Sequence, residues 1–336
     1  MEARSVDAIP RGDEWQYEPK WDGFRCLLSR HGSKVELRSK SDEDLTRYFP
    51  DLVEAAIKLK AAEFVLDGEI VVPHGEAFSF DDLLQRIHPA ASRVKKLAQE
   101  TPALFLAFDL LATAKDKHLA AQPLAKRRPT LEAFAKGQFN SNPTFHLSQA
   151  SASHATAEKW LAQAGGSCDG VIAKRLDLPY QSGNRDGMQK IKNFRSADCV
   201  IGGFRYASKL VAGNRVVGSL LLGLYDDDGL LHHVGFTSAI KQSEKLALTA
   251  KLEPLVAKPG FTGNAPGGPS RWSTERSAEW SPLKPKLVVE VSYDHFSGDR
   301  FRHGTSILRW RPDKAPKQCT FDQLKQKAVN PMKLLG

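Results

Sequence analysis

The sequence predicts an α+β protein of two parts: a domain of antiparallel sheets and helices over residues 1–195, then a smaller β-rich domain over residues 196–336. Three observations lead to this prediction. A chain of 336 residues is long enough for two domains of ~100–200 residues each. Strands and helices in the first part do not alternate regularly, which disfavours a doubly wound parallel sheet. From Val200 onward, short apolar segments predominate.

The elements of the first part follow from apolar runs and their boundaries. Residues 64–72 are β-branched and apolar with acids embedded, and they end at the turn Pro73-His74-Gly75, so we expect a strand. Ser79 is a suitable N-cap for a helix that begins after it. We also expect strands over residues 103–111, 170–174 and 189–194, a polar connection over 120–128, and helices over 130–135 and 154–164, the second stopped by Gly165.

The second part shows the pattern of a small barrel. We expect strands over residues 200–206, 216–225, 230–236 and 287–293, a hairpin turn at Asp227-Asp228-Gly229, one helix over 243–256 and a loop over 259–273. Several short strands with a single helix fit a β-barrel of the OB (oligonucleotide-binding) type.

The composition is that of a globular protein, and the charge distribution bears on whether the protein binds a polyanion. Hydrophobic residues make up 41% of the chain and charged residues 26%, so the chain can bury a core. Apolar runs stay well below ~18 residues and the N-terminus has no secretory signal, so we expect a cytoplasmic protein without a membrane span. Four widely spaced cysteines argue against a zinc ribbon and a disulfide framework. Residues 196–336 carry +7 of the net charge of +9, which predicts a polyanion-binding domain or, alternatively, a solvated basic surface.

The sharpest local motif is Glu18-Pro19-Lys20-Trp21-Asp22-Gly23-Phe24-Arg25. Alone it could be an exposed lysine beside a turn. It is followed in order by Arg38-Ser39-Lys40, Leu66-Asp67-Gly68-Glu69, Ala107-Phe108-Asp109, Asp169-Gly170-Val171-Ile172-Ala173-Lys174, Lys190-Ile191-Lys192 and Arg309-Trp310-Arg311-Pro312-Asp313-Lys314. In this order the motifs resemble those of the covalent nucleotidyltransferases, specifically the ATP-dependent polynucleotide ligases. The similarity is greatest to the small bacterial ligase C and to the ligase domain of ligase D.

The resemblance implies that Lys20 attacks the α-phosphate of ATP and becomes adenylylated. A lysine amine is a nucleophile only when it is deprotonated. We therefore expect neighbouring cations such as Lys190 and Lys192, with a bound metal, to lower the pKa of Lys20 toward neutrality. Because these two lysines lie two residues apart on an expected strand, both face the same side, and the resemblance places them at the α-phosphate.

The resemblance also implies the other groups around the nucleotide. Phe108 would stack on adenine, Glu18 would line the base pocket, and Arg25 and Glu69 would hold the ribose. The remaining residues expected to bind ATP are Asp22 and Lys174, joined from the second domain by Arg309, Arg311 and Lys314, which would orient the leaving pyrophosphate. Binding of the DNA backbone by this basic strand is a compatible alternative for the last three.

Two positions depart from the ligase pattern. Ligases commonly carry glutamate before the glycine of E-G-x-x-x-K, where this chain has Asp169. We expect Asp169 and Glu69 to bind Mg²⁺ or Mn²⁺, although the shorter side chain changes the reach to the metal. At the Ser-Arg motif, either Arg38 or Lys40 would contact the 5′-phosphate of the substrate, and a lysine there lacks the bidentate fork of arginine.

The sequence therefore predicts an ATP-dependent DNA ligase that seals nicks in duplex DNA, in DNA repair. Only 19 residues precede Lys20, which leaves no room for the helical DNA-binding domain of larger ligases or the nicotinamide module of NAD-dependent ones. Such a minimal ligase is expected to be a monomer in a bacterial cytoplasm, at the nucleoid. It would work with a repair primase-polymerase or an end-binding protein. The alternatives are an RNA-capping guanylyltransferase, an RNA ligase and a nucleic-acid-binding protein without catalysis.

Overall fold

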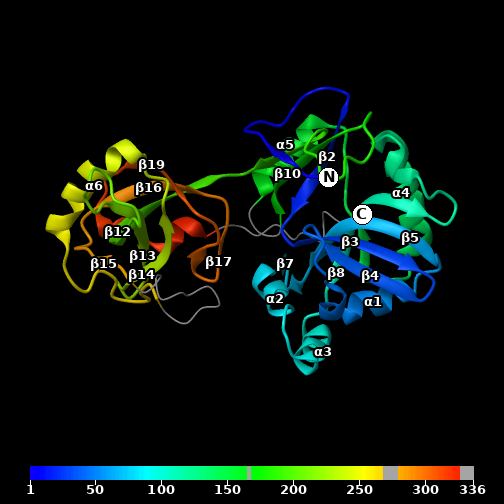
Figure 1. Ribbon diagram of the computed structural model, residues 1–336, viewed down its shortest axis with the longest axis horizontal. Coiled ribbons are helices and arrows are strands. Elements are labelled where there is room, and N and C mark those ends of the chain that lie inside the picture. The colour runs from blue at the N-terminus through cyan, green and yellow to red at the C-terminus, as the bar shows by residue number, and fades with distance from the viewer. Residues whose placement is uncertain (165–167, 268–278, 326–336) are drawn as a thin grey trace. The chain divides into compact units, whose positions relative to one another are not determined.

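The computed structural model describes residues 1–164, 168–267 and 279–325. Its described chain forms two compact units (Figure 1). Unit 1 comprises Met1–Asn193, and unit 2 begins at Phe194. Each unit has its own hydrophobic core.

A five-stranded sheet forms one wall of unit 1, with the order β4-β3-β5-β8-β9. Its strands are β3 (Phe24–His31), β4 (Lys34–Ser39), β5 (Glu63–Val71), β8 (Leu104–Thr113) and β9 (Phe145–Leu147). The pairs are antiparallel except for β8 with β9. The expected strands over 64–72 and 103–111 are confirmed as β5 and β8.

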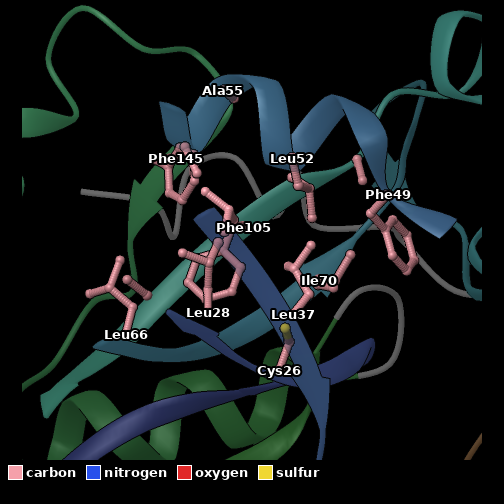
Figure 2. Close-up of a cluster of buried hydrophobic side chains, with 14 of the residues drawn as sticks. Cys26, Leu28, Leu37, Phe49, Leu52, Ala55, Leu66, Ile70, Phe105 and Phe145 are labelled. Carbon is pink, nitrogen blue, oxygen red and sulfur yellow. The ribbon is translucent and has the colours of Figure 1, made fainter. Parts of the chain in front are cut away.

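The core of unit 1 lies between this sheet and α1 (Pro50–Ile57). Figure 2 shows Leu28, Leu66 and Phe105 projecting from the sheet toward Leu52 of the helix. All four side chains are fully buried. Because side chains alternate across a strand, the other face of the sheet carries Arg25 of β3 and Asp67 and Glu69 of β5, with apolar Val71 and Leu106 beside them.

The second sheet of unit 1 has the order β1-β11-β10-β2. Its strands are β1 (Arg4–Ser5), β2 (Trp15–Trp21), β10 (Cys168–Arg175) and β11 (Met188–Lys192). Tyr17, Val171 and Ile191 pack in a cluster with Trp160 of α5 (His154–Gln163), a helix capped by Ser153. The alternate residues of the same strands therefore face away from α5, and this face carries the motif residues Glu18, Lys20, Lys190 and Lys192.

The remaining elements of unit 1 connect these sheets. They are η1 (Thr46–Tyr48), β6 (Pro73–His74), β7 (Ala77–Phe78), α2 (Phe80–Gln85), α3 (Ala91–Glu100), η2 (Leu119–Ala121) and α4 (Leu124–Gln138). Ser79 caps α2 as expected, because its hydroxyl accepts a hydrogen bond from the Asp82 amide at 3.1 Å. The expected stop at Gly165 lies outside the described residues.

One helix of unit 1 differs from the sequence prediction. The helix α4 begins at Leu124, within the stretch expected to be a polar connection, and contains Pro129. Its first amides donate to the carbonyls of Leu178 and Leu176 beyond β10, at 3.0 and 2.8 Å. These long-range bonds satisfy the helix terminus, and local sequence gives no indication of them.

Unit 2 is β-rich. Its strands are β12 (Arg195–Tyr206), β13 (Val217–Tyr225), β14 (Leu231–Thr237), β15 (Ser281–Pro282), β16 (Val288–Tyr293), β17 (Phe296–Ser297), β18 (Arg300–Phe301) and β19 (Ser306–Trp310). The main sheet has the order β14-β13-β12-β16-β19. The four expected strands and the turn at Asp227–Gly229 are confirmed.

The helix expected over 243–256 is shorter in the structure. It is α6 (Lys245–Leu252), flanked by η3 (Gln242–Glu244) and η4 (Glu253–Leu255). Pro254 explains the end, since a proline cannot donate the amide hydrogen bond that continues an α-helix. Two further short helices follow, η5 (Pro316–Gln318) and η6 (Phe321–Leu324). Within the described residues, helices are too short or too polar to cross a membrane.

We expect Phe105→Ala to destabilise unit 1 by about 3–5 kcal/mol, because the fully buried ring packs against Phe145 at 5.6 Å between centroids. Urea unfolding measures this loss. As a control, Ile57→Ala truncates a side chain that is 43% exposed, and it should change the unfolding free energy by less than about 1 kcal/mol. A loss of the same size in both variants would contradict this account of the core.

His233 in β14 predicts an acid sensitivity. Burial, with Arg300 and Arg205 nearby, lowers the pKa of His233 to about 3. An unfolded histidine binds a proton near pH ~6.5, so the unfolded state takes up the proton first and stability falls as the pH drops below that value. We expect about 1.4 kcal/mol to be lost through this group between pH 7.5 and 5.5. Urea unfolding of His233→Phe should show a correspondingly weaker pH dependence, and an unchanged one would contradict the prediction.

Candidate active site

A pocket of about 360 Å³ lies between the two sheets of unit 1. Its lining includes Glu18, Lys20, Arg25, Lys40, Glu69, Phe108, Lys174 and Lys190 from the sequence prediction. The volume falls in the range of small-molecule sites, ~300–1,000 Å³. The polar faces of both sheets therefore enclose one cavity.

Strand register explains how the second sheet forms its wall of the pocket. Lys20 of β2 pairs with Gly170 of β10, and Gly170 pairs with Lys192 of β11. The next row joins Glu18, Ile172 and Lys190 in the same way. Directly paired residues point to the same face, and so do residues two apart along a strand. Lys190 and Lys192 thus share a face, as expected, and this face is the one that carries Lys20.

A β-bulge brings Asp169 next to Lys20. The register shifts between Cys168 and Gly170, so that Asp169 is an additional residue opposite β2. Its carboxylate accepts a hydrogen bond from the Lys20 ammonium at 3.0 Å. Bulges re-aim side chains at functional sites in this way.

Two motif glycines are required by close approach of the backbone. A Cβ on Gly170, whose φ is +152°, would lie 2.0 Å from the Ile191 carbonyl oxygen, and one on Gly23 would lie 2.2 Å from the Ile70 carbonyl oxygen. A side chain at either position would push neighbouring strands apart. The geometry thereby explains the glycine in each Asp-Gly pair, Asp22-Gly23 and Asp169-Gly170.

The charge state of Lys20 differs from the expectation. Burial lowers the pKa of Lys20, but the carboxylates of Asp169, Glu69 and Asp22 outweigh it and raise the pKa above the ordinary value. In the protein without a metal the pKa of Lys20 is therefore raised, whereas the sequence predicted a pKa lowered by neighbouring lysines together with a bound metal; the carboxylates, one of them 3.0 Å from the amine, decide the direction.

The acids that could hold a divalent cation are Asp22, Asp169 and Glu69. One carboxylate oxygen of Asp22 and one of Asp169 lie within 4.8 Å of each other. Glu69 accepts a hydrogen bond from the Gly23 amide at 3.2 Å, and burial raises its pKa to about 8. Carboxylate oxygens are the ligands that Mg²⁺ and Mn²⁺ prefer, so the donor set fits such an ion.

One buried ion pair forms part of the pocket wall near Phe108. Glu18 and Lys174 lie 2.7 Å apart with side chains 3% and 5% exposed, and Gln16 donates a hydrogen bond to Glu18 at 2.8 Å. The Lys174 ammonium also lies 4.5 Å from the centre of the Phe108 ring. This cation–π contact helps to orient the ring, which borders the pocket.

A second network holds Arg25. Its guanidinium donates two hydrogen bonds to Asp67, at 3.1 and 2.7 Å. The Tyr180 hydroxyl donates to the same carboxylate at 2.8 Å, and its ring lies 5.9 Å from the guanidinium of Arg127. The carboxylate at the centre of this network is shielded from solvent, because Asp67 is 1% exposed.

Sequence reasoning missed several residues of this pocket and of the network that holds Arg25. Asp67 stands within a motif that was recognised, but no role was assigned to it. Tyr180, Arg185 and Glu2 gave no indication in the sequence, because their positions depend on contacts over more than a hundred residues.

Seven predicted site residues are not among those that line the cavity. Three of them are related to Lys20: Asp169 accepts its hydrogen bond, the charge of Asp22 helps to raise its pKa, and Lys192 belongs to the same row of paired residues. Arg38 donates a hydrogen bond to the carbonyl of Asp42 at 3.3 Å within its own turn, whereas Lys40, its alternative, does line the pocket. The others belong to unit 2.

Three cations of unit 2 form their own cluster. Arg311 and Lys314 both contact Asp198, at 2.9 and 2.7 Å, and Arg309 contacts Glu290 at 2.6 Å. The predicted role at pyrophosphate is not tested by these contacts.

Comparisons with known proteins identify the family. Residues 2–192 match the ATP dependent DNA ligase domain, and residues 213–314 match the ATP dependent DNA ligase C terminal region. The chain therefore belongs to the ATP-dependent DNA ligases. A solved structure of a Lig E DNA ligase shares the fold, with a TM-score of 0.54 and 17% identity over 93% of this chain and 100% of that one.

Within the family the chain is similar to bacterial ligases of type C. It is 45% identical to DNA ligase C2 of Mycolicibacterium smegmatis, over 96% of this chain and 93% of the relative. It is 41% identical to DNA ligase C of Mycobacterium tuberculosis, over 97% and 93%. The multifunctional non-homologous end joining protein LigD of Mycobacterium bovis is 30% identical over 92% of this chain, but only 37% of LigD is covered. The protein is an ATP-dependent DNA ligase, as the sequence predicted, and not a capping guanylyltransferase or an RNA ligase.

We expect Tyr180→Phe to lower the unfolding free energy by about 1–3 kcal/mol, because Asp67 keeps its charge and burial but loses one donor. Urea unfolding measures the loss. Tyr48→Phe is the matched control, since the Tyr48 ring packs on the guanidinium of Arg47 at 4.7 Å, a contact that phenylalanine retains. Equal stability of all three proteins would show that the Tyr180 hydroxyl does not support Asp67.

Proposed function

We propose that this DNA ligase seals nicks that carry a 5′-phosphate and a 3′-hydroxyl, through a lysyl-AMP intermediate on Lys20. The Lys20 amine forms a bond to the α-phosphorus of ATP as the bond to pyrophosphate breaks. An oxygen of the DNA 5′-phosphate then displaces the amine from that phosphorus. Finally the 3′-hydroxyl attacks the 5′-phosphate, and AMP leaves.

The observation that carries this proposal is the row of Lys20, Gly170 and Lys192 on the pocket face. It sets a nucleophilic amine beside a second cation, with a residue between them that has no side chain. Negative charge that develops on the α-phosphate would be met by fixed positive charge from Lys192 and from Lys190 in the next row. The remaining pocket residues would hold the nucleotide: Phe108 and Glu18 the base, Arg25 and Glu69 the ribose, and Lys174 the Phe108 ring.

A divalent ion fits the reaction that we propose. Mg²⁺ or Mn²⁺ bound by Asp169, with Asp22 or Glu69, would neutralise the carboxylates that raise the pKa of Lys20. Asp169 would then no longer hold the proton of Lys20, so the amine could attack. This proposed role of the metal would explain why the carboxylate of Asp169 contacts Lys20.

For unit 2 we propose a closed OB barrel within an OB-fold domain over residues 196–336, after an adenylylation domain over residues 1–195. Three hydrogen bonds support closure between the ends of the sheet. The amide and hydroxyl of Thr305 donate to the Phe236 carbonyl at 3.5 and 3.2 Å, and the Thr237 hydroxyl donates to the Thr305 carbonyl at 2.7 Å. Thr305 directly precedes β19, and Phe236 and Thr237 end β14.

The substrate we propose is nicked duplex DNA, bound mainly through its phosphates by Lys40 and by the cations of unit 2. Arg309, Arg311 and Lys314 would orient the pyrophosphate before DNA binds. The proposed setting is DNA repair at the nucleoid of a bacterial cytoplasm, with a primase-polymerase or an end-binding protein as partner. It is supported by relatives named as DNA repair proteins. Co-purification of such a partner from the host checks this setting, and repeated isolation without one would count against it.

Covalent labelling tests the proposed chemistry. We expect α-labelled ATP with Mg²⁺ or Mn²⁺ to leave an acid-labile label on the denatured protein, and pyrophosphate to remove it. Lys20→Ala should abolish the label and reduce sealing of a nicked duplex by at least about 10³-fold, because it removes the nucleophile. Lys159→Ala, which removes an exposed lysine of α5, is the control.

Two results would contradict the proposal. A label that persists in Lys20→Ala would place the nucleophile elsewhere. A label formed from GTP in preference to ATP would point to capping chemistry.

A further inference from the structure

An acidic residue stands at the mouth of the phosphate-accepting pocket. The carboxylate of Glu2 lies 3.3 Å from the Lys40 ammonium and 3.2 Å from the Arg185 guanidinium. All three residues line the cavity that contains Lys20. Lys40 follows β4 and Arg185 precedes β11, so Glu2 joins two cations that come from different sheets.

The backbone holds Glu2 in this place. Its amide donates a hydrogen bond to the Asn184 carbonyl at 2.8 Å, next to Arg185. The residues that follow pair in parallel with β11, with Ser5 opposite Lys190, and the Val6 amide donates to the Lys190 carbonyl at 3.1 Å. The position of the carboxylate is therefore set by a strand pairing.

The surroundings of Glu2 are strongly positive. Burial and neighbouring cations lower the pKa of Lys190. These cations, in order of effect, are Lys192, Lys20, Lys40 and Arg185. Cations that lie close enough together to disfavour protonation of Lys190 attract an anion, and in the protein alone the carboxylate of Glu2 is that anion.

Stability does not explain this arrangement. The side chains of Lys40 and Arg185 are 57% and 68% exposed. Ion pairs this exposed contribute little to folding, because solvent screens them. A carboxylate in this place does, however, compete directly with any phosphate group that approaches the same two cations.

We propose that Glu2 is an internal stand-in for phosphate, which occupies Lys40 and Arg185 until a phosphate group of the substrate displaces it. The proposal rests on the proposed function, in which the pocket takes ATP and Lys40 faces the DNA 5′-phosphate. A terminal phosphate carries about −2 charge and three acceptor oxygens, against one charge and two oxygens for the carboxylate. The phosphate therefore displaces the carboxylate of Glu2, but its affinity for the two cations is lower than it would be without Glu2. In this way Glu2 sets the affinity of the site for phosphate.

Equilibrium binding to Glu2→Gln tests this role. Every protein in the test carries Lys20→Ala, so that ATP binds without reacting and the result does not depend on lysyl-AMP formation. One arm measures ATP, and the other measures a nicked duplex with a 5′-phosphate. The amide keeps the shape of the side chain and removes its charge. We expect the dissociation constant to fall by roughly threefold to tenfold in at least one arm. The arm that responds identifies whether ATP or the nick supplies the phosphate.

Three comparisons make the result specific. Glu100→Gln removes a carboxylate from another exposed ion pair, with Lys96 at 3.5 Å, and should leave both affinities unchanged. Adding Lys40→Ala or Arg185→Ala to Glu2→Gln should cancel the gain, since the gain comes from those cations. A nick with a 5′-hydroxyl should bind Glu2→Gln and the parent equally well.

The proposal is overturned if Glu2→Gln binds both ligands no more tightly than the parent protein. It is also overturned if the 5′-hydroxyl nick or the Glu100→Gln control shows the same gain, because the effect would then be a general change of net charge. Failure of the proposed function is a separate result, namely the absence of a Lys20-dependent label in the otherwise unmodified chain.

Discussion

The pairing of β2 with β10 at Gly170 is the constraint on which the rest of the pocket depends. The absence of a side chain at Gly170 lets β11 approach β10, since a Cβ would collide with the Ile191 carbonyl. The approach sets Lys20 and Lys192 in one row, and the bulge next to it turns Asp169 toward Lys20. One residue more or fewer in this segment would turn every following side chain of β10 to the opposite face.

Buried ion pairs make the wall of the pocket rigid. Glu18 with Lys174, Arg25 with Asp67, and Asp109 with Arg127 are all held at 2.9 Å or closer by at least one contact. Burying such charges is costly, and replacing them by apolar groups often stabilises a protein. Their value here is positional, because each pair fixes the direction of side chains in or next to the pocket wall.

Two acids, Asp169 and Glu2, contact cations that line the pocket. Asp169 contacts the nucleophile, and Glu2 contacts the cations at the mouth. Before ligands bind, these carboxylates balance a cavity lined by cations, which would otherwise repel one another. The protein thus keeps its lysines in place at the expense of some affinity, and the raised pKa of Lys20 is one consequence of this balance.

The sequence by itself determined the class of the protein and the main part of its site. The order of the motifs, from Glu18–Arg25 to Lys190–Lys192, indicated a ligase, and apolar, β-branched runs predicted strands at 64–72 and 170–174. These features are local, since side-chain direction along a strand follows from residue number alone. The tertiary structure decided the start of α4, the network of Tyr180 and Asp67, and the contact of Glu2 with Arg185. It also decided the charge on Lys20. Each of these depends on distances between residues remote in the chain, and a pKa or an ion pair is fixed by such distances and not by residue type.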